Sequence, residues 1–389
     1  MSQQRVTETP ALPAGIETRH VDNGHGLTMH LLEAGHRGDP LILLLHGFPE
    51  LAYSWRKVLV RLAQAGFYVI APDQRGFGHT TGWDGDYDGD LASYTQLSLV
   101  RDAMGLVAAL GYRTVDAVVG HDMGSTVAGY CALARPDVFR SVAFMSAPFA
   151  GPPAFAFDTA EQQGDNAKPH GTDISATLAA LDPPRKHYQH YFRSRQAAAD
   201  MLAAPQGVHA FLRAYFHTKS ADWPGNAPAP LQALTASELA TLPGYYVMQQ
   251  DKTMPETVGP EMPTPEQIAA CQWLPDAELA VYAETFCRTG FQGALQWYRA
   301  FAEPAFQREL YIVSGRTVDM PSCFIAGKKD WGIYQFPGRF ERMRDTTCTR
   351  MLGCHLIPGA GHWVQQEQPE AVTAHLLTFF EEARRLRTA

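Results

Sequence analysis

The stretch of sequence that decides the fold runs from Val115 to Ser125 and reads Val-Asp-Ala-Val-Val-Gly-His-Asp-Met-Gly-Ser. Its first half is apolar and rich in valine, which is typical of a short buried strand. Small residues follow at once and predict a helix over Gly124 to Ala134 that packs closely on this strand. The stretch is therefore a strand that runs directly into a helix, with Asp122 at the turn between them.

Gly120, Asp122 and Gly124 have the spacing of a nucleophile elbow, a sharp turn that holds its middle side chain out at the carboxyl end of a strand. A carboxylate needs no base to deprotonate it at neutral pH, and it can attack an electrophilic carbon to form an ester. The alternative is an aspartate that only caps the helix, and so short a motif often occurs by chance. The stretch alone leaves both interpretations open.

On both sides of this stretch, short β-rich runs alternate with amphipathic runs of helical length, which predicts a mostly parallel sheet flanked by helices. The alternation stops near residue 148 and resumes after residue 318. We therefore expect an α/β core in two parts, 1–148 and 319–389, and a mainly helical inserted cap at 149–318. The strands expected in the core are Ile16–Val21, Thr28–Glu33, Leu41–His46, Tyr68–Ala71, Ala117–Gly120, Ser141–Met145, Cys323–Ala326 and Arg350–Leu356.

Helix signals within the cap are local. Two pairs have the spacing of capping boxes, namely Thr235 with Glu238 and Thr264 with Gln267. A further helix is expected to start at Asp276, as its cap, and to end at Gly290. Prolines are dense between these signals, so the middle of the cap should consist of short, interrupted helices.

The composition is that of an ordinary globular enzyme and argues against several other classes. The 389 residues are 46% hydrophobic and 19% charged, which disfavours disorder or a fibrous role. A net charge of −8 without Lys/Arg runs disfavours nucleic acid as a partner. No apolar run approaches the ~18 residues of a membrane span, and the polar N-terminus has no signal core, so we expect a cytoplasmic protein. The six cysteines lack metal-ligand spacing, and we expect no metal.

Two residues beyond the cap complete the chain order of nucleophile, acid and histidine that such elbows use. Asp330 follows the expected strand at Cys323–Ala326, and His362 lies on a glycine-flanked loop before the last helix. A histidine on such a loop can turn its ring into the site, and a carboxylate on its other nitrogen fixes the tautomer. We therefore expect Asp122, Asp330 and His362 to act together, with Asp330 as the orienting acid.

The turn His46-Gly47-Phe48-Pro49-Glu50 closes a very apolar strand and can expose backbone N–H groups. In this scheme the amides of Phe48 and Met123 bind the negative oxygen that forms when water attacks an ester on Asp122. The alternative is a tight turn without a catalytic role. A glycine-rich stretch from Asp73 to Gly82 lacks the third glycine and the following helix of a dinucleotide site, so we interpret it as structural.

With these motifs the chain resembles the α/β-hydrolase superfamily and, within it, the epoxide hydrolases. The resemblance covers nearly the whole length, and its blocks are jointly more specific than any one of them. The blocks are His46 to Glu50 with Ser54-Trp55-Arg56, Asp73 to Thr80, Gly120-His121-Asp122 with Gly124, and Gly361-His362-Trp363.

The resemblance implies an enzyme that needs neither metal nor organic cofactor and opens an apolar epoxide with water. In that family two cap tyrosines hold the epoxide oxygen, and the matching segments point to Tyr188, with Tyr191 as the alternative, and to Tyr298. A phenol stays protonated at neutral pH and can donate to the basic alkoxide that forms. A homodimer is left open. The resemblance places the substrate pocket at Phe48, Trp55, Trp297 and Trp363.

Two other functions stay open at this stage. A haloalkane or haloacid dehalogenase would use Asp122 to displace halide, although Met123 stands where the family and the related dehalogenases commonly carry Trp. A protein that keeps the fold only to bind a small ligand would not need the complete set. A serine esterase fits poorly, because Ser125 lies three residues beyond the elbow position. We therefore expect an epoxide hydrolase in which Asp122 forms an ester that His362 and Asp330 hydrolyse.

Overall fold

The computed structural model describes residues 12–154 and 174–388, so most of the polar N-terminal segment (1–11) lies outside it. Within these residues the centre is an eight-stranded sheet in the order β1-β2-β4-β3-β5-β6-β9-β10. Neighbours from β4 to β10 run parallel, whereas β2 is antiparallel to both β1 and β4, so the predicted mostly parallel sheet is confirmed. The strands are β1 (Glu17–Asp22), β2 (Thr28–Ala34), β3 (Leu41–Leu45), β4 (Tyr68–Pro72), β5 (Ala117–His121), β6 (Val142–Met145), β9 (Ser322–Gly327) and β10 (Met351–Ile357).

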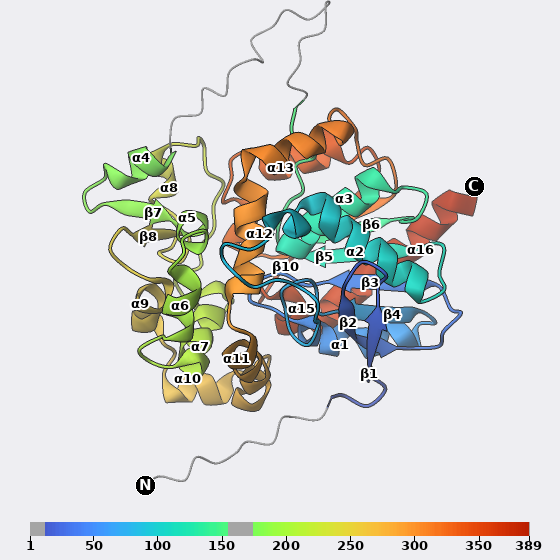
Figure 1. Cartoon of the computed structure of the whole chain (residues 1–389), viewed down its shortest axis with the longest axis horizontal. Helices are drawn as coiled ribbons and strands as arrows, with labels where there is room; N and C mark the ends of the chain where they lie inside the picture. Colours follow the sequence, from blue (N-terminus) through green and yellow to red (C-terminus); the bar gives the residue numbers. More distant parts are fainter. Residues whose placement is uncertain (1–11, 155–173, 389) are drawn as a thin grey trace, which may run out of the picture.

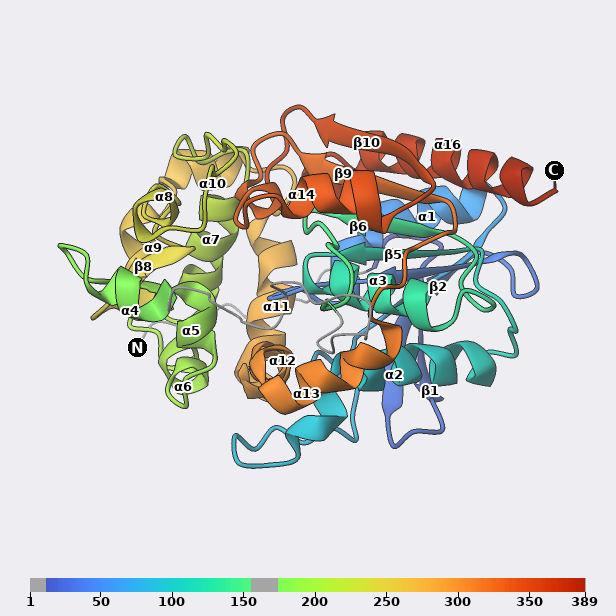
Figure 2. The same ribbon diagram turned by 90° about the horizontal axis from the view of Figure 1, so that it is seen from above.

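The central strands are covered by helices on both faces, which is why they read as continuous apolar runs. Every residue of β3, β5 and β9 is buried. Helices α1 and α16 pack on one face through their own side chains Leu59, Leu376 and Phe380, and α2 and α3 pack on the other (Figure 2). The core helices are α1 (Arg56–Gln64), α2 (Gln96–Ala109), α3 (Met123–Ala134), α14 (Arg339–Arg342), α15 (Val364–Glu367) and α16 (Pro369–Thr388).

The chain between β6 and β9 forms a mainly helical insertion beside the carboxyl edge of the sheet, as predicted (Figure 1). It also contains a small antiparallel pair of strands, β7 (Arg185–His187) and β8 (Val247–Gln249). Strands of three residues are too short to be recognised from a sequence pattern. The boundaries at 149 and 318 stay a prediction. The helices are α4 (Ile174–Ala179), α5 (Tyr188–Phe192), α6 (Ala197–Leu202), α7 (Val208–Lys219), α8 (Ala236–Leu239), α9 (Met254–Val258), α10 (Pro265–Ala270), α11 (Asp276–Thr289), α12 (Gln292–Ala302) and α13 (Pro304–Glu309).

The helix-end predictions in the cap meet different outcomes. The capping box of Thr264 and Gln267 is confirmed at α10. Thr235 caps α8, but its box is incomplete, because the Glu238 carboxylate accepts from the Gln232 N–H instead.

Helix α11 ends at Gly290 as predicted, with φ +66°, a conformation that favours glycine. The predicted cap at its start is wrong, since Pro275 is the N-cap. The Asp276 carboxylate instead pairs with Arg213 on α7 at 2.7 Å, so tertiary contact overrides the local capping preference.

Arg56 on α1 joins the core to the cap. Its side chain is 1% exposed, donates to Gln366 Oε1 at 2.9 Å, and forms an ion pair with Glu278 on α11. Substituting Arg56→Met should lower the free energy of unfolding by roughly 2–3 kcal/mol, because Glu278 and Gln366 lose a charged donor. The matched variant Arg61→Met breaks the exposed pair with Glu370 and a bond to the Lys57 carbonyl within α1, and should cost less than about 1 kcal/mol. Urea unfolding checks this, and equal losses in the two variants would contradict it.

The described part of the chain holds no group of three or more His, Cys, Asp or Glu side chains arranged to bind a metal ion. None of its helices combines the length and the apolar character that crossing a membrane requires.

Candidate active site

Asp122 occupies the sharp turn between β5 and α3 with φ +53°, a backbone region that side chains rarely adopt. The flanking glycines allow this turn. A Cβ at Gly120 would lie 2.1 Å from the Gly124 carbonyl oxygen, and one at Gly124 would lie 2.4 Å from that of Leu45. Such strain costs on the order of 1–3 kcal/mol and clusters at functional sites. The structure thus has the predicted strand, turn and helix, with Asp122 at the end of β5.

The Asp122 side chain meets two of its predicted partners. The Phe48 N–H donates to Oδ1 at 3.1 Å, and His362 Nε2 lies 3.3 Å from Oδ2. Burial raises the pKa of Asp122, but the contact with His362 and the positive charge of Lys219 outweigh it and hold this pKa well below its usual range. Asp122 is therefore a carboxylate at neutral pH, although the residue is only 9% exposed.

His362 joins Asp122 to Asp330. Its Nδ1 lies 3.1 Å and 3.2 Å from the two Asp330 oxygens, and Asp330 Oδ1 also accepts from the Gly332 N–H at 2.7 Å. The three side chains follow β5, β9 and β10, whose carboxyl ends meet at one edge of the sheet. The structure thus brings together the three residues that the sequence selected, in the order Asp122, His362, Asp330.

The loop that carries His362 is held by the cap as well as by the core. The His362 N–H donates to the Lys219 carbonyl at the end of α7, at 2.8 Å. Burial raises the pKa of Glu367 to about 8, although three N–H donors favour its charged form. Those donors lie at 2.8–3.0 Å and belong to Ala221, Gly361 and Trp363.

A second histidine and carboxylate pair supports the first, and the sequence analysis assigned it no role. His121 Nδ1 lies 2.5 Å from Glu50 Oε2, and its Nε2 lies 2.7 Å from the His362 carbonyl oxygen. Burial lowers the pKa of His121, but the Glu50 carboxylate outweighs burial and raises it. His121 can then donate to the His362 carbonyl and fix the backbone of that loop. Both residues lie within motifs that carry the family resemblance, His46 to Glu50 and Gly120 to Gly124, which is the sequence signal for this pair.

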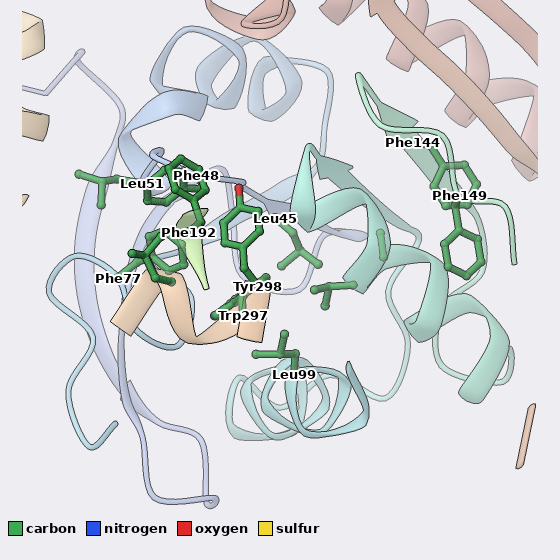
Figure 3. Close-up of a cluster of buried hydrophobic side chains, with 14 of the residues drawn as sticks. Leu45, Phe48, Leu51, Phe77, Leu99, Phe144, Phe149, Phe192, Trp297 and Tyr298 are labelled. Atoms are coloured by element: carbon green, nitrogen blue, oxygen red, sulfur yellow. The ribbon is translucent and has the colours of Figure 1, made fainter. Parts of the chain in front are cut away.

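Tyr188 and Tyr298 line the same cavity as Asp122. Their ring centroids are 6.1 Å apart, and Tyr298 lies beside Phe48 and Phe192 (Figure 3). Burial and the nearby Asp122 charge raise the pKa of Tyr188, so the phenol stays protonated. Tyr191 points elsewhere, since its hydroxyl donates to Asp200 Oδ2 at 3.0 Å. This geometry favours Tyr188 over Tyr191 as the first cap phenol.

None of the four residues of the predicted aromatic pocket is among those that line the cavity that contains Asp122, so that pocket stays a prediction. Trp55 is fully buried in the separate cluster under α1 and α16. Trp297 Nε1 donates to the Arg75 carbonyl at 2.9 Å, and Trp363 Nε1 donates to the Phe216 carbonyl at 2.8 Å. Phe48 contributes its backbone N–H to Asp122 and its ring to the packing. The cavity is lined by Asp122, Met123, Thr126, Ala147, Tyr188, Gln189, Arg193, Tyr298, Phe301, Ala302, Gln335, Phe336 and Arg339.

Lys219 is a site residue that sequence reasoning missed. Its side chain is 4% exposed, and its ammonium lies 5.2–6.0 Å from four ring centroids, those of Tyr215, Tyr245, Tyr246 and Trp363. Burial lowers the pKa of Lys219, opposed by the charges of Asp122, Asp330 and Glu50. Its charge in turn lowers the pKa of Asp122 and of Asp330. A lone lysine at a helix end gives no sequence signal for this position.

Substituting Lys219→Met should therefore raise the pKa of Asp122. The carboxyl group should then titrate at a higher pH than in the wild type, by up to about one unit, because it loses a nearby positive charge. NMR titration of the Asp122 carboxyl carbon checks this. Lys219→Arg keeps the charge and should restore the wild-type titration, and Lys328→Met removes an exposed lysine as the control. An unchanged titration of Asp122 in Lys219→Met would contradict the assigned effect.

A parallel sheet with an aspartate at a strand-to-helix elbow and a helical insertion before the last strands defines an α/β hydrolase. Residues 40–369 match the family model described as alpha/beta hydrolase fold. The chain is 32% identical to epoxide hydrolase A of Mycobacterium tuberculosis, over 94% of this chain and 98% of that protein. It is 30% identical to an epoxide hydrolase of Caballeronia sordidicola, over 91% of each.

Solved structures agree with these relatives. An epoxide hydrolase from an endophytic Streptomyces superposes with a TM-score of 0.74 at 29% identity, over 96% of this chain and 97% of that chain. Potato (Solanum tuberosum) epoxide hydrolase I gives 0.71 at 28% identity, over 94% and 99%. The chain belongs to the α/β-hydrolase fold family and, within it, to the family of the epoxide hydrolases.

Proposed function

We propose that this protein hydrolyses epoxides to vicinal diols through a covalent ester on Asp122. The observation that carries the proposal is that Tyr188 and Tyr298 line the same cavity as Asp122. His362 contacts the Asp122 carboxylate, and Asp330 contacts the other nitrogen of His362. The named activities of the relatives support the same reaction class.

In the first half-reaction an Asp122 oxygen attacks an oxirane carbon. The bond from that carbon to the ring oxygen breaks, and the oxygen takes a proton from Tyr188 or Tyr298. Burial raises the pKa of both phenols, so they hold their protons until the strongly basic alkoxide forms. The product is a hydroxyalkyl ester of Asp122.

In the second half-reaction water attacks the ester carbonyl and gives its proton to His362, whose imidazolium Asp330 stabilises. The carbonyl oxygen becomes negative, and the N–H groups of Phe48 and Met123 are proposed to bind it. In the free enzyme the Phe48 N–H already donates to Asp122 Oδ1, which supports this role. Collapse breaks the ester C–O bond and frees the diol, whose alkoxide takes the proton held by His362. The proton left on the Asp122 carboxyl passes to the tyrosinate through water, which regenerates the Asp122 carboxylate and the phenol.

The test incubates the purified protein with two panels of compounds and measures the products. One panel holds aryl and alkyl epoxides, and the other holds the matching haloalkanes. Diol formation from epoxides without halide release is the expected result. Halide release alone would make the protein a dehalogenase, and tight binding of both panels without products would make it a binding protein. Either outcome would overturn the proposal.

A further inference from the structure

The cavity that contains Asp122 has a positively charged solvent end. Asp122 is buried, whereas Arg193 after α5 is half-buried and Arg339 at the start of α14 is exposed, so the two arginines mark the outer part of the lining. Arg193 Nε donates to the Gln189 carbonyl at 3.1 Å, and the Arg339 guanidinium lies 4.1 Å from the centre of the Phe336 ring. Both guanidinium groups thus sit at the entrance to the site.

Neither arginine has a carboxylate partner among the residues that the structure describes. Partial desolvation lowers the pKa of Arg193 and of Arg339. By contrast, hydrogen bonds to aspartates raise the pKa of Arg135, Arg195 and Arg344. Arg193 is a half-buried cation without a counter-ion, and an incoming anion would offset the cost of its desolvation, while the exposed Arg339 adds a second positive charge to the same lining.

A buried amide adds a second polar group to the same wall. Gln335 is 9% exposed, and its Oε1 has no hydrogen-bond partner among the described residues. Its Nε2 reaches only the Gly332 carbonyl, at 3.5 Å. Buried amides are normally satisfied, and the free Oε1 is an acceptor, so Gln335 is matched to a hydroxyl donor such as those of the diol product, and the arginines are the groups matched to an anion.

We propose that the substrate is a compact epoxide that carries a carboxylate, which Arg193 and Arg339 bind while Asp122 attacks the ring. This inference rests on the proposed function and refines the apolar substrate expected from the sequence. An anionic substrate is repelled by the Asp122 carboxylate, and the two arginines offset that repulsion. Guanidinium groups pair with carboxylates through forked hydrogen bonds.

The size of the cavity limits the substrate. Its volume is about 150 Å³, below the ~300–1,000 Å³ of typical ligand pockets. Arg339 is close enough to Tyr188 for its charge to lower the pKa of that phenol, partly opposing the effect of burial. The substrate should therefore be small, about the size of one ring that carries both the oxirane and the carboxylate.

The turnover experiment compares 4-(oxiran-2-yl)benzoate with its neutral amide. Wild-type kcat/KM should favour the carboxylate by about tenfold or more, and Arg193→Gln with Arg339→Gln should reduce that ratio to near one. Each single variant should reduce it in part, which keeps the test valid if the double variant folds poorly. Arg342→Gln removes an exposed arginine from the same short helix and should leave the ratio unchanged.

A binding experiment separates this inference from the proposed function. Calorimetry with benzoate and benzamide measures the contribution of the two arginines to binding, without any turnover. Benzoate should bind the wild type at least about tenfold more tightly than benzamide does. Equal affinity for the two probes, or a carboxylate preference that survives in the double variant, would overturn the inference. Failure to hydrolyse either epoxide while benzoate binds selectively would overturn only the proposed function.

Discussion

Replacing His362 by Gln should reduce steady-state turnover of an epoxide by about 1,000-fold or more, while ester formation stays within about tenfold of the wild-type rate. The reason lies in the two contacts of the ring. His362 Nε2 faces Asp122 Oδ2 at 3.3 Å, where water must lose its proton, and Asp330 stabilises the charge from the other side. The carboxylate of Asp122 needs no base for its own attack, so only the second half-reaction should stop.

Rapid-quench kinetics check this expectation. The variant should form a stoichiometric amount of the Asp122 ester in its first turnover and then stall without releasing diol. His36→Gln is the matched control, because that histidine is fully exposed and distant in the chain from the site residues. Steady diol production by His362→Gln would contradict the assigned role.

The double variant Tyr188→Phe with Tyr298→Phe should slow ring opening by about 1,000- to 10,000-fold. Phenylalanine keeps the aromatic packing around Phe48 and Phe192 but removes both hydroxyl groups that can protonate the oxygen. The ring oxygen must then leave as an alkoxide, with no nearby acid to protonate it. Each single variant should lose less, because the other phenol can still donate.

Single-turnover rates of ester formation measure this loss. Tyr191→Phe controls for the removal of a hydroxyl from the same helix, because Tyr191 donates to Asp200 and does not line the cavity. It should retain nearly wild-type rates. A double variant that opens the ring as fast as Tyr191→Phe would contradict the role of the two phenols.

The core and the Asp122, His362 and Asp330 set were predictable because their signals are local. Asp122 and Asp330 follow the buried strands β5 and β9, His362 follows the half-buried edge strand β10, and parallel strands place their carboxyl ends at one edge of the sheet. The elbow could be read from two glycines, whose missing side chains make the tight approach of β5 and α3 possible.

The pocket walls were less predictable, because a sequence does not show which face of a cap helix meets the core. Trp297 and Tyr298 are neighbours on α12, and a helix turns about 100° per residue. Tyr298 therefore faces the cavity while Trp297 packs against Arg75 on the core.

Lys219 depends on tertiary structure in the same way. Its ammonium is surrounded by rings from α7, from the segment before β8 and from the loop after β10. No local pattern in the sequence brings these segments together, so neither its burial nor its effect on Asp122 could be predicted.

The most direct test of the covalent mechanism is intact-protein mass spectrometry of His362→Gln after incubation with styrene oxide, followed by peptide mapping. The account predicts a mass gain equal to the whole epoxide, located on the peptide that contains Asp122, and no gain when Asp122→Ala is added. A protein that turns over the epoxide without this adduct, or carries the adduct on another residue, would contradict the account.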